Sequence, residues 1–136
     1  MNDQMVKKRP NPTKVLVVED DPLNLKLLQL MLDKLGVDMM AARDGEEALE
    51  MLGESPAEVM LLDIALGPGM SGVTLMEKLR NKKEYTKTPI IAVTAYNYSE
   101  LRNYINKEGF NEYMGKPISY NQLKNVFEKL DLVSSE

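Results

Sequence analysis

The sequence predicts a doubly wound α/β fold, in which a parallel sheet lies between two layers of helices. Apolar runs of strand length alternate with helical patterns five times between residues 14 and 131. The first run is continuously apolar, as expected for a strand that is buried on both faces. Glycine, proline and capping residues stand where one pattern changes to the other. This alternation predicts five βα units that build a parallel sheet.

The first half of the chain holds three predicted strands and two predicted helices. Strands are expected over residues 15–18, 37–42 and 59–62. The first helix begins at Asp21, an N-cap acid that precedes a proline, and ends at Gly36. Leucines recur along it at helical spacing at positions 25, 28, 32 and 35. The second helix follows Asp44-Gly45 and carries Ala48, Leu49 and Leu52.

The second half continues the pattern with a longer loop and three further helices. We expect a loop at Gly67-Pro68-Gly69, strands over residues 89–93 and 111–114, and helices over residues 73–79, 99–107 and 120–130. The helix over 99–107, ended by Gly109, is more polar than the others. A helix that buries little apolar surface is expected to be marginally stable and adjustable.

Chain length predicts the order of the strands. A chain of 136 residues suits one domain with a sizeable core. Five units in this length fit the flavodoxin-like order 2-1-3-4-5, a three-layer α/β sandwich. The first and third strands are then neighbours beside the topological switch point. We expect a flexible lead-in over residues 1–13, the domain over 14–131 and a tail over 132–136.

Composition excludes several classes of site. The chain has no cysteine and no histidine, which rules out disulfides, histidine metal sites and a Ser-His-Asp triad. The net charge of −4 argues against direct nucleic-acid binding. No apolar stretch approaches the length of a membrane span, so a cytoplasmic location is expected by default.

Polar groups close the predicted strands. Glu19 and Asp20 follow the first strand, Asp63 the third, Thr94 the fourth and Lys116 the fifth. The carboxyl ends of parallel strands meet at one crevice, so these side chains are expected to converge. Taken singly, each has a simpler interpretation as a cap, a loop residue or a solvated turn.

Converging acids, a hydroxyl and an ammonium group suit a divalent metal and a phosphoryl group. Hard oxygen donors favour Mg²⁺ or Mn²⁺, and the Ala65 carbonyl is a further candidate ligand. Asp63 is then a candidate nucleophile, as in aspartyl-phosphate chemistry. Thr94 and Lys116 are candidates for binding the phosphoryl oxygens.

From residue 14 to about residue 131, the chain resembles a response-regulator receiver domain of two-component signalling. The motifs that carry the resemblance are Glu19-Asp20-Asp21-Pro22, Leu-Leu-Asp63-Ile, Ala-Val-Thr94-Ala95 and Tyr113-Met-Gly-Lys116-Pro117. The resemblance implies a phosphoacceptor at Asp63. It implies metal binding by Asp20, Asp63 and the Ala65 carbonyl, with Glu19 acting partly through water. It also implies phosphoryl contacts from Thr94 and Lys116, a switch formed by Thr94 and Tyr113, and a cis bond before Pro117.

Two features depart from the pattern of that family. The loop from Asp63 to Gly72 is one residue longer than usual, with the extra residue at Gly67 or Gly69. Tyr96, two residues after Thr94, is a candidate for shielding Asp63 from water.

The resemblance implies a phosphorylation switch and not a turnover enzyme. A histidine kinase or histidine phosphotransfer protein would supply the phosphoryl group, since this chain has no histidine. The fourth helix, fifth strand and last helix would then bind a downstream protein or a second copy.

Two other functions stay open. A receiver-like docking module that never takes phosphate shares the same fold. An Asp-nucleophile phosphohydrolase resembling the haloacid dehalogenases shares the Asp, Thr, Lys and Mg²⁺ set. Its Asp-x-Asp pair after the first strand is replaced here by Glu19-Asp20-Asp21-Pro22.

Overall fold

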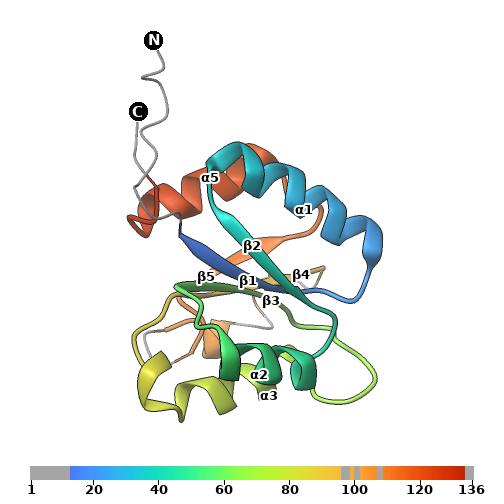
Figure 1. Ribbon diagram of the computed structural model, residues 1–136. Helices are drawn as coiled ribbons and strands as arrows, with labels where there is room; N and C mark the ends of the chain where they lie inside the picture. The colour runs from blue at the N-terminus through green and yellow to red at the C-terminus, as the bar shows by residue number, and fades with distance from the viewer. Residues whose placement is uncertain (1–12, 96–98, 100–101, 107–108, 134–136) are drawn as a thin grey trace.

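Figure 1 shows a computed structural model of the chain, which describes residues 13–95, 99, 102–106 and 109–133. Five parallel strands form one sheet in the order β2-β1-β3-β4-β5, which confirms the predicted order. The strands are β1 (Lys14–Val18), β2 (Asp38–Ala42), β3 (Val59–Asp63), β4 (Ile90–Thr94) and β5 (Glu112–Gly115).

Helices cover both faces of the sheet. In Figure 1, α1 (Pro22–Leu35) and α5 (Tyr120–Lys129) lie above the strands, and α2 (Gly45–Glu54) and α3 (Gly72–Arg80) lie below them. A short 3₁₀ turn, η1 (Lys83–Tyr85), follows α3. The ends of these strands and helices differ from the predicted ones by at most one residue, which is within the usual uncertainty at the end of an element.

Two apolar layers hold the sandwich together, one on each face of the sheet. Successive strand side chains point to opposite faces, so each buried strand supplies both layers. The layer below the sheet joins Leu16, Met60 and Ile90 to Leu52 of α2 and Leu79 of α3. The layer above it is formed by Val17, Leu61, Ile91, Leu28, Leu32, Leu123 and Phe127, with Met114.

The caps explain where most helices begin. The side chains of Asp44, Ser71 and Ser119 each accept a hydrogen bond from a backbone N–H of the first helical turn. Asp21 is the N-cap residue of α1, as predicted, but its side chain makes no capping hydrogen bond. Pro22 at the first helical position fixes the backbone there instead.

The predicted fourth helix over residues 99–107 is wrong at its carboxyl end. A 3₁₀ turn, η2 (Arg102–Tyr104), occupies its middle. Ile105 then pairs with Phe110 in an isolated parallel bridge, where a helix was expected. Phe110 is fully buried, so its burial draws the chain into this pairing in place of a continuous helix. Residues 100, 101 and 107 of the expected helix lie outside the described part of the chain.

The two ends of the folded unit meet away from the carboxyl ends of the strands. The hydroxyl of Thr13 donates a hydrogen bond of 3.3 Å to the carbonyl of Leu132, and both residues are buried. They lie one residue outside the predicted domain limits of 14 and 131. In the ranges that the structure describes, no helix has the length and apolar character needed to cross a membrane.

Candidate functional site

Three acids meet at the carboxyl ends of β1 and β3. Ligand oxygens of Glu19, Asp20 and Asp63 all lie within 4.8 Å of one another. Glu19 and Asp63 are buried, at 2% and 4% exposure, whereas Asp20 is exposed. The cluster therefore has a buried floor and an acid on its solvent side.

Strand pairing brings these acids together from distant parts of the sequence. The adjacent strands β1 and β3 pair Val17 with Leu61 and Val18 with Leu62. Val17 and Leu61 face the layer formed with α1 and α5. Glu19 and Asp63 each come two residues later, so alternation sends both side chains to that same side of the sheet.

Lys116 joins the two buried acids from the end of β5. Its Nζ lies 2.8 Å from Oδ2 of Asp63 and 3.0 Å from Oε1 of Glu19. Burial by itself would lower the pKa of Lys116. The hydrogen bonds to Asp63 and Glu19 and the charges of these two acids outweigh that effect, so the pKa is raised above its usual value. The ammonium group thus compensates both carboxylates.

The second oxygen of each buried carboxylate accepts a backbone hydrogen bond. The N–H of Ala65 donates to Oδ1 of Asp63 at 3.0 Å, and the N–H of Asp21 donates to Oε2 of Glu19 at 3.1 Å. Each carboxylate is therefore held at both oxygens by groups from its own loop and from Lys116. A site positioned in this way needs little rearrangement before it binds a ligand.

The longer loop after Asp63 is attached to the start of both lower helices. An added Cβ on Gly72, at the start of α3, would collide with the Asp63 carbonyl and lie 2.8 Å from Cα of Ile64. Gly69 has a φ of 107°, a conformation that favours glycine. Met70 packs on Gly45 at the start of α2. Loop and helices thus fix the backbone of Asp63 from below.

Thr94 and Tyr113 come from adjacent strands and face the lower side of the sheet. Thr94 is fully buried and Tyr113 is half-buried. β4 pairs Ala92 with Tyr113 and Thr94 with Gly115. The Tyr113 hydroxyl lies 3.2 Å from where a Cβ on Gly115 would be, so the ring extends toward the residue paired with Thr94.

The bond between Lys116 and Pro117 is cis, as the resemblance implied. Tyr96 lies outside the described residues.

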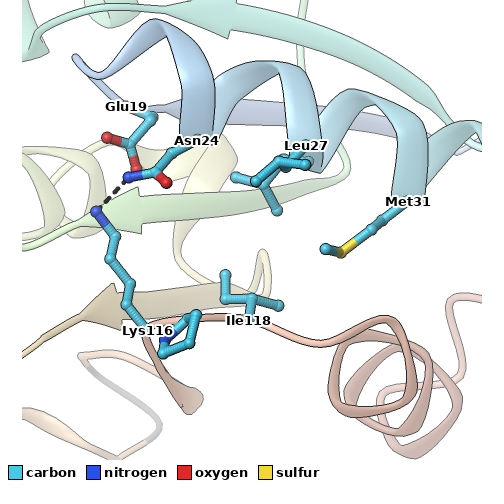
Figure 2. A pocket seen from close by; sticks show the side chains of 8 residues that line it. Glu19, Asn24, Leu27, Met31, Lys116 and Ile118 are labelled. Carbon is cyan, nitrogen blue, oxygen red and sulfur yellow. Dashed lines mark ion pairs between the residues drawn. The ribbon is translucent and has the colours of Figure 1, made fainter.

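A groove beside Lys116 and Glu19 was not predicted from the sequence. It holds a cavity of about 60 Å³. Figure 2 shows Lys116 reaching Glu19 at one end, with Leu27 and Met31 of α1 and Ile118 lining the remainder. Leu23, Leu27 and Leu30 are 64%, 45% and 60% exposed along the outer face of α1. Their spacing resembles that of core leucines, so the helical pattern alone could not separate them from the buried set.

The donor set fits a hard divalent cation. Three carboxylates in close proximity repel one another unless a cation is present, and oxygen ligands favour Mg²⁺. Lys116 carries one positive charge and contacts Glu19 and Asp63, so it neutralises only part of the charge of the three acids. The carbonyl of Ala65 belongs to the same loop, next to the N–H that holds Asp63.

Comparisons with known proteins show the family to which the sequence is related. The sequence profile of the family described as Response regulator receiver domain matches residues 15–128. The polar-differentiation response regulator DivK of Brucella anthropi is 35% identical over 108 residues, which cover 79% of this chain and 87% of DivK. The sensor histidine kinase GacS of Pseudomonas protegens is 33% identical over 119 residues, which cover 85% of this chain. The chain spans only 13% of the length of GacS.

Solved structures share the fold. One is the receiver domain of a sensor histidine kinase from Pseudomonas aeruginosa, with a magnesium ion coordinated in its active site cleft. It has a TM-score of 0.77 and 27% identity, and the match covers 87% of this chain and 96% of that domain. The chemotaxis response regulator CheY4 of Vibrio cholerae has a TM-score of 0.81 at 24% identity, with coverage of 88% and 99%. The likeness to CheY4 supports the fold alone.

Proposed function

The chain belongs to the response regulator receiver domain family, and we propose that Asp63 accepts a phosphoryl group from a phosphohistidine of a partner protein. The observation that carries this proposal is the arrangement around Asp63. A buried carboxylate lies 2.8 Å from a lysine ammonium and beside two further acids. That arrangement suits a nucleophile whose product carries additional negative charge.

The proposed transfer moves one phosphoryl group between two side chains. A carboxylate oxygen of Asp63 forms a bond to phosphorus while the phosphorus–nitrogen bond to the donor imidazole breaks. The nitrogen keeps the electron pair of the broken bond. Lys116 and the Thr94 hydroxyl bind the phosphoryl oxygens. A Mg²⁺ held by Asp20, Asp63 and the Ala65 carbonyl, with Glu19 through water, would supply charge neutralisation.

The groove between α1 and Pro117-Ile118 is the proposed docking surface for the donor. It begins at Lys116 and Glu19, so a partner seated on it would bring its reactive group to Asp63. Exposed leucines on α1 supply apolar contact area. A few side chains of this kind suit an encounter that forms and separates during each transfer, and not a permanent complex.

Switching would start at the phosphoryl group and move Thr94 and Tyr113. A threonine drawn toward the new oxygens would alter the space next to Gly115, toward which Tyr113 extends. The surface expected to respond includes β5 and α5, where a downstream partner or a second copy would bind. The described residues 102–106, which hold the 3₁₀ turn η2 and the bridge from Ile105 to Phe110, would belong to the same surface.

Relatives of the chain are response regulators and sensor kinases, which are signalling proteins. A histidine kinase or histidine phosphotransfer protein is therefore the proposed donor, and the chain is proposed not to act as a turnover enzyme. Its cytoplasmic location and its domain limits stay predictions. A phosphate-independent docking module is the alternative function.

Intact mass spectrometry after incubation with acetyl phosphate tests the proposal. The wild type should gain the mass of one phosphoryl group in the presence of Mg²⁺ and little without it. Asp63→Asn should gain none, because the amide is not a nucleophile of the required kind. A wild type that stays unmodified, or an adduct that persists in Asp63→Asn, would favour the docking module or another acceptor.

A further inference from the structure

Arg80, the last residue of α3, binds the two segments that lead into β4 and β5. Its guanidinium donates two hydrogen bonds to the Gly109 carbonyl, at 3.1 and 2.8 Å. It donates two more to the carbonyls of Tyr85 and Thr88, at 2.7 and 2.8 Å. A fifth reaches the side-chain oxygen of Asn111 at 2.9 Å. One side chain therefore connects α3 to both segments.

Asn111 extends this connection into the sheet. Its side-chain oxygen also accepts from the N–H of Ile90 at 2.7 Å, and its own N–H donates to the Ile90 carbonyl at 2.8 Å. The amino ends of β4 and β5 are thus fastened to each other and to Arg80. A planar fork of donors suits this set of acceptors, and the single ammonium of a lysine would not match it.

The opposite end of α3 touches the proposed phosphoacceptor. Gly72 packs directly against the Asp63 carbonyl, and its N–H donates to the Ile64 carbonyl at 3.0 Å. Between these ends, Leu75, Met76 and Leu79 are buried in the lower core. A packed helix of nine residues spans roughly 13 Å and moves more readily as a unit than by bending.

We propose that α3 and Arg80 form a coupling route between Asp63 and the amino ends of β4 and β5. Arg80 is a positioning residue in this route. The other route begins at Thr94, the last residue of β4, and passes to Tyr113, whose ring extends along β5 toward Gly115 at the carboxyl end of that strand. Gly109 is also linked to the segment that contains η2. Its N–H donates to the Asn106 carbonyl at 3.1 Å, and the N–H of the next residue, Phe110, donates to the Tyr104 carbonyl at 2.7 Å.

The geometry implies how a change at Asp63 would travel. A shift of the Asp63 backbone pushes on Gly72, because no space separates the two. The buried face of α3 transmits the shift to Arg80. The three hydrogen bonds from Arg80 to Gly109 and Asn111 then move these two residues, or weaken. Coupling of this kind is a free energy shared by two sites, so it must be tested as a difference of responses.

The experiment rests on the proposed phosphorylation, so phosphorylation of Asp63 and the response at the amino end of β5 are measured separately. Wild type and Arg80→Met are incubated with acetyl phosphate and Mg²⁺, and the phosphoryl adduct is measured by intact mass. Amide hydrogen exchange of residues 109–112 is then compared with and without acetyl phosphate. In wild type, phosphorylation should change the amide exchange rates of these residues about fivefold or more. In Arg80→Met the adduct should form normally while that response is lost.

Three further variants separate coupling from simple loss of stability. Lys78→Met alters an exposed charge on the same helix and should keep the response. Leu52→Ala destabilises the lower core from α2 and should also keep it. Arg80→Lys keeps the positive charge but lacks the planar set of guanidinium donors, so it should restore little of the exchange response.

Each contrary outcome is distinct. An unmodified wild type would overturn the proposed function and this route with it. A normal adduct with an unchanged response in Arg80→Met, or with a response equally lost in Leu52→Ala, would overturn the route alone.

Discussion

The ammonium of Lys116 lies 2.8 Å from Oδ2 of Asp63, although 53 residues separate the two in sequence. The same ammonium reaches Glu19 at 3.0 Å. A single cation therefore compensates two buried acids, and its position at the end of β5 makes that strand part of the site. Removing it should affect both the stability of the protein and its dependence on Mg²⁺.

Lys116→Met should destabilise the protein by about 2–3 kcal/mol without Mg²⁺, because two buried carboxylates lose their partner. Saturating Mg²⁺ should recover part of this loss, since a divalent cation replaces the missing charge. Urea unfolding with and without Mg²⁺ measures both effects. The control is Lys129→Met, which removes an ion pair whose lysine is 68% exposed and should change neither value. Equal loss in the two variants would contradict the prediction.

Alkaline pH should weaken the wild type more than Lys116→Met. The raised pKa of Lys116 means that the folded state keeps this proton after the unfolded state has lost it. The stabilising contribution is complete below the unfolded value of about 10.4 and declines as the pH rises through the folded value. Unfolding free energies at roughly pH 9.5 and 11 should therefore fall further in wild type. Parallel profiles would show that Lys116 gains no proton affinity on folding.

Gly72→Ala should destabilise the fold by about 1–3 kcal/mol and slow phosphorylation of Asp63. The new methyl group would collide with the Asp63 carbonyl, so the acceptor strand or α3 must shift. Gly53→Ala in α2 has nothing within 4 Å of the added carbon and should stabilise by roughly 0.5–1 kcal/mol. Urea unfolding and acetyl phosphate labelling test both variants. The idea fails if Gly72→Ala is as stable as wild type.

Replacing Leu23 and Leu27 together by alanine should slow transfer from a phosphohistidine donor roughly tenfold or more. The two side chains are 64% and 45% exposed, so folding should change little. Labelling by acetyl phosphate should also be unaffected, because a small donor needs no docking surface. Gln29→Ala, on the side of α1 toward β2, is the matched control. The docking surface would be wrong if both phosphodonors lost rate equally.

The failure to predict the end of the fourth helix shows the limit of local patterns. Residues 99–107 have a polar helical pattern, yet Ile105 pairs with Phe110. Phe110 lies at the end of this segment and is fully buried. It belongs to the lower core together with residues of β4 and α3 and with Tyr85, none of which a local window contains.

Arg80 illustrates a second limit. In sequence it is an ordinary basic residue in the last turn of a helix, where a solvated charge is the usual interpretation. Four of its five hydrogen bonds go to backbone carbonyls, which carry no sequence signal. The exposed leucines of α1 are a similar case. Helical spacing marks several leucines, and only the packed sheet decides that Leu28 is buried and Leu27 is not.

The sequence by itself determined the sheet order and the polar groups at the carboxyl ends of the strands. Continuous apolar runs and capping residues depend on local chemistry, so they can be read from neighbouring residues, and the number of βα units in a chain of this length indicated the strand order. The tertiary structure alone decided which donor binds each carboxylate oxygen of Asp63 and Glu19, which leucines stay exposed and which acceptors Arg80 binds. Those outcomes depend on distances between segments far apart in the chain, and such distances exist only once the core has packed.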